Sequence, residues 1–411
     1  MKNVLYLHDD EIANYNYSRG HPMKPLRVSM THTLVVNYNL HKQMDIMKPK
    51  HASYENLLNF HSNDYVNFLS SVCGDNMEDM SKDLNNFNVK GDCPVFSGLF
   101  DYCKSVAGGS IMAASKINMK EYSTVINWSG GLHHAKKSEA SGFCYVNDIV
   151  LCCLELLKVH ERVLYIDIDI HHGDGVEEAF YCTDRVMTLS FHKYGDFFPG
   201  TGRLEDRGRE KGENYAVNVP LKDGIDDESY NKIFVPVVER IIETFQPSAI
   251  ILQCGADCLS GDKLGCFNLT EKGHGDCVAY VKSFNLPTIV LGGGGYTIEN
   301  VARAWTYDTG KILDVNLDND IPYNEFMDYY MPTYKLKVPK LNLENLNEQK
   351  DIDHIINTIY DNLKNIKAAP SVQMIQTPSN FVTDENDDDL VYKRLFEKNH
   401  QEDADSTLID Q

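Results

Sequence analysis

Short, almost continuously apolar runs alternate with longer helical stretches from about residue 122 onward. Six runs rich in β-branched and aromatic residues predict strands, at residues 123–127, 162–167, 185–191, 215–220, 248–253 and 287–291. The run Val163-Leu164-Tyr165-Ile166 is typical of a strand that is covered on both faces, because no charged residue interrupts it. The alternation predicts an α/β fold with a single open, mainly parallel sheet and helices on both faces.

Two stretches between these runs predict helices. Residues 148–158 are apolar nearly all round and predict a buried helix, whereas residues 229–245 carry apolar pairs at 233/234, 237/238 and 241/242 that predict one buried face. We expect Pro236 either to kink this second helix or to lie in its first turn. The first 120 residues are expected to be mainly helical after a first strand at residues 4–7.

Charge and composition exclude several classes of protein. The 411 residues include 39 Lys and Arg against 60 Asp and Glu, a net charge of −21. Such a chain lacks the basic face that binds phosphates, so a basic partner is expected and direct nucleic-acid binding is not. The N-terminus reaches charged residues too early for a signal peptide, and no apolar run approaches the ~18 residues of a membrane span. We therefore expect a soluble chain without membrane association.

The cysteines and the C-terminal composition add two expectations. The 11 cysteines lack paired C-x-x-C spacing, so most of them are expected to be small buried residues in a reducing compartment. From residue 383 to the C-terminus the chain has 10 acidic and 3 basic residues. We expect a domain over residues 1–380 and an acidic, disordered tail over residues 384–411, with binding of basic partners as the alternative role of the tail.

Polar and glycine-rich segments follow four of the predicted strands, at residues 129–134, 167–175, 255–257 and 292–296. In open α/β sheets, sites form outside the carboxyl ends of the strands, so these loops are expected to converge. Asp167, Asp169 and His171 occupy alternate positions and would project to one side of an extended backbone. Asp169, His171 and Asp257 would give three metal ligands and leave one coordination position open, which is typical of a catalytic metal. Zn²⁺ is our first expectation for the ion and Fe²⁺ the second.

Each segment alone also has a simpler interpretation. The pair His133 and His134 could be a packed or surface feature, and the Asp-x-Asp-x-His pattern could be a turn cluster. The glycines at 292–295 could cradle a phosphate, but they lack the Lys-Ser/Thr of a P-loop. Four such clusters at strand ends in one chain favour a shared site.

Six motifs in order carry a resemblance to a known family. They read GHPMKP at 20–25, DCPVF at 92–96, WSGGLHHA at 128–135, YIDIDIHHGDG at 165–175, QCGAD at 253–257 and GGGGY at 292–296. From about residue 6 to about residue 376, the sequence resembles the class I histone deacetylases of the zinc-dependent arginase–deacetylase group. The resemblance implies that residues 1–380 form a deacetylase catalytic domain with its catalytic loops at the C-terminal ends of the strands. It also implies a nuclear enzyme, with the cytoplasm as a second location, that removes acetyl groups from histone lysines.

The resemblance implies one zinc ion per chain, held by Asp169, His171 and Asp257. Related arginases bind a second metal through carboxylates two positions beyond the shared histidine and aspartate. Here those positions are Gly173 and Leu259, which offer no ligating side chain.

The resemblance also implies catalytic roles. His134 would be the general base and later the acid, and His133 would tune the local charge. Asp167 and Asp174 would accept the Nδ1 protons of these two histidines. The Tyr296 hydroxyl would donate a hydrogen bond to the developing oxyanion.

A substrate path follows from the same resemblance. Phe143 and Phe198 would wall a narrow tunnel for an acyl-lysine, and Gly142 would offer a backbone carbonyl. Asp92 and Leu264 would lie at the rim, where Asp92 would accept backbone N–H groups of the substrate. The expected inner cavity, which would release acetate, is lined by Met23, Arg27 and Cys144. Two structural potassium sites are also implied, an inner one at Asp167, Asp169, His171, Ser190 and Phe191 and an outer one at Phe180, Thr183, Val186 and Tyr215.

The sequence departs from the family where class I members bind inositol phosphate together with a corepressor. Lys24 and Gly20 are kept, but Lys263 and Glu299 stand where arginines are expected. Corepressor proteins and acetylated histone tails are expected partners, whereas inositol phosphate is a doubtful one because a carboxylate repels it. An acetylpolyamine or other small-molecule amidohydrolase and a catalytically weak scaffold in a repressor complex are the alternative functions. Asp92 favours a polypeptide substrate.

Overall fold

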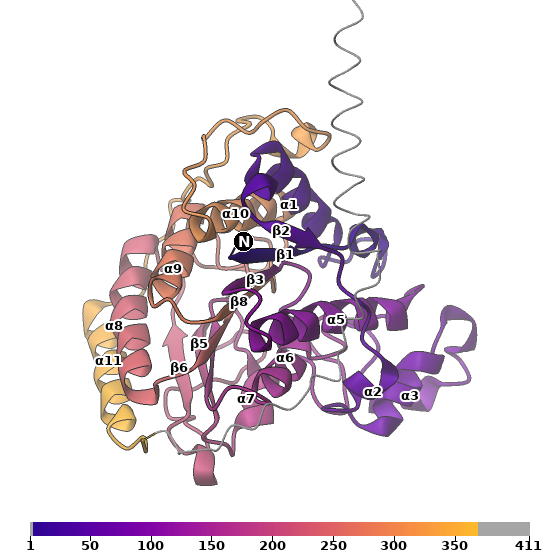
Figure 1. The fold of residues 1–411 in the computed structure, drawn as a ribbon, viewed down its shortest axis with the longest axis horizontal. Coiled ribbons are helices and arrows are strands. Elements are labelled where there is room, and N and C mark those ends of the chain that lie inside the picture. Colours follow the sequence, from indigo (N-terminus) through magenta and orange to yellow (C-terminus); the bar gives the residue numbers. More distant parts are fainter. Residues whose placement is uncertain (1–2, 369–411) are drawn as a thin grey trace, which may run out of the picture.

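The computed structural model describes residues 3–368, and they form one eight-stranded sheet covered by helices (Figure 1). The strand order is β2-β1-β3-β8-β7-β4-β5-β6, and every neighbouring pair is parallel. The predicted α/β fold with a single parallel sheet is confirmed. The tail predicted at residues 384–411 lies outside the described residues.

All seven predicted strands are present, with ends that shift by a few residues. The strands are β1 (Val4–Leu7), β2 (Asp45–Met47), β3 (Thr124–Asn127), β4 (Val163–Asp167), β5 (Val186–Lys193), β6 (Ala216–Leu221), β7 (Ala249–Gln253) and β8 (Thr288–Leu291). Every residue of β4, β7 and β8 is buried, as expected for strands covered on both faces. The short edge strand β2 was not predicted, because its three residues are only partly buried and show no apolar run.

Two helical layers enclose the sheet. The helices are α1 (Leu26–Asn37), α2 (Tyr54–Leu57), α3 (Asn63–Ser71), α4 (Ser81–Asn86), α5 (Leu99–Asn118), α6 (Asp148–Leu156), α7 (Asp174–Phe180), α8 (Asp227–Phe245), α9 (Glu271–Ser283), α10 (Ile298–Ile312) and α11 (Gln349–Leu363). Helices α1, α10, α9, α8 and α11 pack side by side in that order on one face, and α5, α6 and α7 lie on the other (Figure 1). This arrangement confirms the prediction of helices on both faces.

Helix α8 shows how local signals set its boundaries. Asp226 caps its N-terminus by accepting a hydrogen bond from the backbone N–H of Ser229, so the helix begins earlier than the apolar pattern suggests. Pro236 therefore lies inside the helix, and the prediction that it could occupy the first turn is wrong. The predicted buried face is present and includes Ile233, Phe234, Val237, Val238 and Ile241.

Because all strands are parallel, the loops that follow β3, β4, β7 and β8 leave the sheet at the same edge. This edge carries the motifs that the sequence singled out. All 11 cysteines are free thiols, and eight of them are buried, which agrees with their expected role as small core residues. Within residues 3–368, no helix is both long and apolar enough to cross a membrane.

Candidate active site

Three side chains from two strand ends meet in the interior. Asp169 and His171 follow β4, Asp257 follows β7, and all three are buried. The Nδ1 atom of His171 lies 3.2 Å from an Oδ1 of Asp169 and 3.1 Å from an Oδ2 of Asp257. A tetrahedral zinc ion with bonds of about 2.0–2.1 Å needs ligand atoms roughly 3.3 Å apart. The spacing and the donor types therefore fit one zinc ion.

The electrostatics of this cluster also call for a cation. Burial and repulsion from Asp169 raise the pKa of Asp257 to about 7, because two carboxylates face each other in the interior. Each carboxylate is fixed by further donors: the amide of Gln253 and the backbone N–H of Gly294 lie 3.0 and 2.8 Å from Asp169 Oδ2. The backbone N–H of Ile170 donates to Asp257 Oδ1 at 2.9 Å. A divalent ion would neutralise this buried charge.

Two adjacent histidines follow β3 and lie beside the cluster. His133 Nδ1 is 2.7 Å from Asp167 Oδ2, and His134 Nδ1 is 2.8 Å from Asp174 Oδ1. Burial and the neighbouring His133 lower the pKa of His134 to about 3, which keeps its imidazole neutral. Burial opposes the charged form of His133 as well, but Asp167 and Asp169 outweigh it and raise the pKa of His133 to about 9. At neutral pH, His133 is therefore protonated and His134 is neutral, although the two residues are adjacent.

Two residues that the sequence reasoning did not single out support this pair. The Tyr165 hydroxyl donates to Asp167 Oδ2 at 2.6 Å, and the Lys136 ammonium lies 2.7 Å from Asp174 Oδ2. Both stand inside or beside the motifs read from the sequence. Nothing in the sequence shows that their side chains turn toward these carboxylates.

A pocket of about 240 Å³ leads from the surface to the histidines. It is lined by Asp92, His134, Gly142, Phe143, His171, Phe197, Phe198, Leu264 and Tyr296. Phe198 and Leu264 are 44% and 38% exposed and lie at its mouth, whereas His134 and His171 are buried at its base. The pocket thus brings together all five residues expected to bind substrate. Phe197 was missed; its ring stacks on His171 with centroids 5.0 Å apart.

The turn at Gly142 shapes one wall of the pocket. Gly142 and Phe143 both adopt positive φ angles, of 50° and 67°. A Cβ atom at Gly142 would lie 2.4 Å from His134 Cδ2, so only glycine fits against the histidine ring. The Tyr17 hydroxyl donates to the carbonyl of Phe143 at 2.9 Å and holds the turn from behind.

The loop after β8 brings Tyr296 to the pocket. The backbone N–H groups of Tyr296 and Thr297 donate to Asp262 Oδ2 at 2.7 and 3.0 Å. Asp262 also accepts from the N–H of Leu264 at 2.9 Å, so one carboxylate holds both the tyrosine loop and the rim. Gly294 is required here, because a Cβ atom would lie 2.1 Å from Asp257 Oδ2. Sequence reasoning missed Asp262, which belongs to none of the motifs.

The residues expected around an inner cavity are Met23, Arg27 and Cys144, and all three are buried. The Arg27 guanidinium donates to the carbonyl of Gly295 at 2.8 Å and to the carbonyl of Gly293. Arg27 thus braces the loop that carries Tyr296. Gly173 is the N-cap residue of α7, and Leu259 is buried. Neither belongs to the metal cluster that the described residues form at this pocket.

The residues of the two expected potassium sites lie on neighbouring strands and turns. In the inner set, Asp167 of β4 is paired in register with Ser190 of β5, and Phe191 is the next residue of that strand. In the outer set, the N–H of Thr183 donates to the carbonyl of Phe180 at 3.2 Å. Val186 begins β5, and Tyr215 directly precedes β6. These contacts join Asp167 to Ser190 in the inner set and Phe180 to Thr183 in the outer set.

Known proteins are similar to this chain over most of its length. A model of the histone deacetylase domain matches residues 21–312. Histone deacetylase HDAC1 of Drosophila melanogaster is 56% identical over 388 residues, which cover 94% of this chain and 74% of that protein. Histone deacetylase 1 of Homo sapiens is 57% identical over 381 residues, covering 93% of this chain and 79% of that protein. Type-1 histone deacetylase 1 of Dictyostelium discoideum is 56% identical over 391 residues, covering 94% and 79%. A chain with this domain, these relatives and this pocket belongs to the class I histone deacetylases.

Proposed function

We propose that this chain is a zinc-dependent protein-lysine deacetylase that removes acetyl groups from N-ε-acetyl-lysine of histones and thereby represses transcription. The observation that carries the proposal is the pocket that Phe143 and Phe198 line together with His134 and the metal-cluster residue His171. Its walls suit the apolar methylenes of a lysine side chain, and its base holds the groups that hydrolyse an amide. Family membership supports the same activity.

The proposed cofactor is one Zn²⁺ ion held by Asp169, His171 and Asp257. When bound, zinc lowers the pKa of water from 15.7 to about 7 and polarises an amide oxygen. The mixed nitrogen and oxygen donor set also suits Fe²⁺, which is the alternative ion. Potassium at the two sets of residues on β5 and its neighbours would have a structural role.

His134 is the proposed proton carrier. Its Nδ1 hydrogen bond to Asp174 fixes the tautomer that leaves Nε2 free, and His134 lines the pocket. The neutral imidazole takes a proton from the attacking water as the water oxygen bonds to the acetyl carbon. It then returns that proton to the lysine nitrogen as the carbon–nitrogen bond breaks, giving acetate and lysine. His133, held by Asp167, adjusts the charge beside this exchange.

Tyr296 is the proposed oxyanion donor. Its side chain lines the same pocket as His134, and burial raises the pKa of its hydroxyl well above the usual value, so the group remains a donor. One such donor contributes roughly 3 kcal/mol to the stability of a transition state. Arg27 and Asp262 hold the backbone of the loop that carries Tyr296.

The substrate is proposed to be a polypeptide. Asp92 is exposed at the mouth of the pocket, where its carboxylate can accept N–H groups of an extended peptide backbone. An acetylpolyamine offers no such backbone, and a catalytically weak scaffold would not need an intact metal cluster with His134 and Tyr296. These alternatives are therefore less well supported.

A turnover assay tests the proposal. The value of kcat/KM on an acetylated histone peptide should exceed the value on an acetylpolyamine by at least about tenfold. Asp92→Asn should lower kcat/KM on the peptide only, whereas Asp75→Asn, a change at another exposed carboxylate, should alter neither. A higher kcat/KM on the polyamine would identify the amidohydrolase, and no turnover of either substrate would favour the scaffold.

Nuclear location and assembly with corepressor proteins are proposed on the basis of family membership. Residues 1–380 would form the catalytic domain and residues 384–411 an acidic tail. Inositol polyphosphate is proposed to bind weakly, because Glu299 in the first turn of α10 and the exposed Lys263 replace two expected arginines. Calorimetric titration should then show at least tenfold tighter binding to Glu299→Arg than to the wild type. Tight binding to the wild type without gain in the variant would contradict this proposal.

A further inference from the structure

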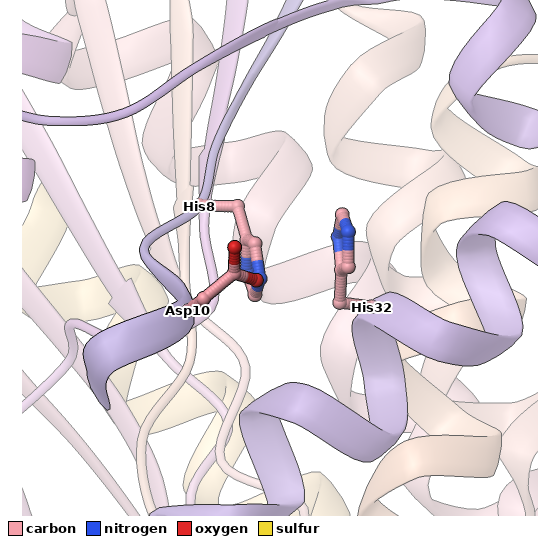
Figure 2. Close-up of side chains that lie close together, drawn as sticks. All are labelled: His8, Asp10 and His32. Carbon is pink, nitrogen blue, oxygen red and sulfur yellow. The ribbon is translucent and has the colours of Figure 1, made fainter. Parts of the chain in front are cut away.

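A second cluster of metal-ligating side chains lies at the end of β1, outside the active-site pocket (Figure 2). His8 directly follows β1, Asp10 begins the 3-10 helix η1 (Asp10–Asn14), and His32 lies on α1. One nitrogen or oxygen atom from each of the three lies within 4.8 Å of the other two. None of these residues belongs to the motifs that form the catalytic site.

The cluster has a defined geometry. His8 Nε2 is 2.8 Å from Asp10 Oδ1, so the carboxylate already holds one edge of the His8 ring. The rings of His8 and His32 lie face to face, with centroids 3.7 Å apart and planes 4° from parallel (Figure 2). Tyr6 stacks on both rings at 5.7–5.8 Å and covers the cluster from the sheet.

Within residues 3–368, one ring nitrogen of His8 and one of His32 are buried without a hydrogen-bond partner. His8 and His32 are only 2% and 9% exposed, yet the Nδ1 atom of each has no hydrogen-bond partner in the part of the chain that the structure describes. Buried nitrogen atoms of this kind are rare, because each has lost its hydrogen bonds to water without a replacement. Burial, with His8 and His41 nearby, also lowers the pKa of His32 to about 3, so its imidazole is in the neutral form that binds metals.

We propose that His8, Asp10 and His32 bind a divalent transition-metal ion such as Zn²⁺ at a site independent of the catalytic one. Two imidazoles and a carboxylate are the ligands that such ions prefer, and the net charge of −21 attracts cations to the chain. The Asp10 side chain is 69% exposed, which gives an ion a path from solvent. Because ligating lone pairs lie in the plane of each ring, binding turns one imidazole out of the face-to-face stack.

The location of the cluster predicts what the ion does. It would join the end of β1 to α1, the helix whose Arg27 braces the Tyr296 loop. The ion would lie away from the reacting atoms and would stabilise the packing of α1 on the sheet. It would therefore raise the melting temperature of the chain without being required for turnover.

A neighbouring cluster provides a matched control. Asp9, Glu11 and His51 also offer three ligand atoms within 4.8 Å of one another. Lys48 Nζ lies 3.3 Å from Asp9 Oδ1 and 3.1 Å from Glu11 Oε1, so an ammonium group already occupies this cluster. His51 should therefore contribute nothing to metal binding.

The experiment is a calorimetric titration of Zn²⁺ into the full chain whose catalytic site is already loaded with zinc. The wild type should bind one further equivalent, and its melting temperature should rise with added Zn²⁺. His32→Gln and Asp10→Asn should each lose that equivalent and the rise, whereas His51→Gln should keep both. Because the Asp10 side chain is exposed, Asp10→Asn should fold normally. A loss of binding in this variant therefore cannot be attributed to a folding defect such as His32→Gln could have.

Three outcomes would overturn the proposal. The wild type could bind no further ion, which would make the cluster a packing stack only. The further equivalent could persist unchanged in both His32→Gln and Asp10→Asn, or it could disappear in His51→Gln. As a spectroscopic check, Co²⁺ bound at the further site of the wild type should give an absorption band that His32→Gln abolishes.

Discussion

The catalytic cluster of Asp169, His171 and Asp257 and the β1 cluster of His8, Asp10 and His32 both lie beyond the ends of parallel strands, and they differ in how closely their ligand atoms are held. After β4 and β7, His171 Nδ1 lies 3.1–3.2 Å from two carboxylate oxygens that backbone N–H groups hold in position. After β1, the His8 and His32 rings stack 3.7 Å apart, and a hydrogen bond of 2.8 Å joins His8 Nε2 to Asp10 Oδ1. Both have metal-binding side chains, but only the first is preorganised. The backbone N–H groups that hold the carboxylates therefore distinguish a catalytic metal site from a site that must rearrange to bind a metal ion.

The largest expected effect is the loss of the preorganised cluster. Asp257→Ala should abolish deacetylation and the binding of the catalytic zinc ion, because it removes one of three ligands. Activity on an acetyl-histone peptide and metal content by mass spectrometry check this, with Asp79→Ala as a control at an exposed carboxylate. Full activity in Asp257→Ala, or two tightly bound ions that are both needed for turnover, would contradict the one-zinc assignment.

The next effect separates the reacting groups from the metal ligands. His134→Ala and Tyr296→Phe should each lower kcat by roughly 10²-fold or more, because the first removes the proton carrier and the second an oxyanion donor. Binding of a hydroxamate inhibitor should fall less than turnover, since the zinc ligands remain. A kcat within twofold of the wild type for Tyr296→Phe would refute its assignment as the oxyanion donor.

The fold was predictable to the extent that burial leaves a pattern in the sequence. The six interior strands show continuous apolar runs because both faces are covered, and all six were predicted, as was the edge strand β6. The edge strand β2 has no such pattern, since Asp45, Ile46 and Met47 are only partly buried. The start of α8 was misjudged because its signal is the capping side chain of Asp226 and not the hydrophobic period.

The candidate site was predictable where its residues lie in local motifs. Asp169 and His171 are two positions apart, so their common direction follows from strand geometry alone. Phe197, Asp262 and Lys136 act through contacts that depend on how distant loops fold together. No spacing in the sequence reports such a contact. The same is true of His8 and His32, which are 24 positions apart and meet only because α1 packs across the end of β1.

A smaller effect tests how much the carboxylate of Asp262, which accepts hydrogen bonds from the Tyr296 loop, contributes to catalysis. Asp262→Ala should lower kcat by about tenfold with little change in KM, because Tyr296 and Thr297 lose their common acceptor and the oxyanion donor is less well positioned. Steady-state kinetics on an acetyl-peptide measure this. Asp262→Asn, which retains one acceptor oxygen, should recover part of the loss.

Asp206 provides the matched control for Asp262, since its carboxylate also accepts a backbone N–H within a loop, that of Arg203 at 3.0 Å, but away from the pocket. Asp206→Ala should keep kcat within twofold of the wild type. Equal losses in both variants would mean that Asp262 has only a general structural role.

The smallest expected effect is a change in stability with pH that comes from the cluster of His8, Asp10 and His32 without added metal. His32 faces His8, Asp10 and His41, and burial with its histidine neighbours lowers its pKa to about 3, against 6.5 in the unfolded chain. Below pH 6.5 the unfolded chain therefore binds a proton that the folded chain does not, so acid favours unfolding. One group changes the free energy of unfolding by at most about 1.4 kcal/mol per pH unit, which gives about 1–2 kcal/mol between pH 6.5 and pH 5.

Urea unfolding at the two pH values measures this difference. The stability of the wild type relative to His32→Gln should fall by that amount on acidification, because the contributions of titrating groups that do not interact with His32 cancel in the comparison. His354→Gln, a change at an exposed histidine, should show no such pH dependence. A difference between wild type and His32→Gln that stays constant from pH 6.5 to pH 5 would mean that His32 takes up a proton in the folded chain. The stacked imidazoles would then be too well solvated to need a metal ion.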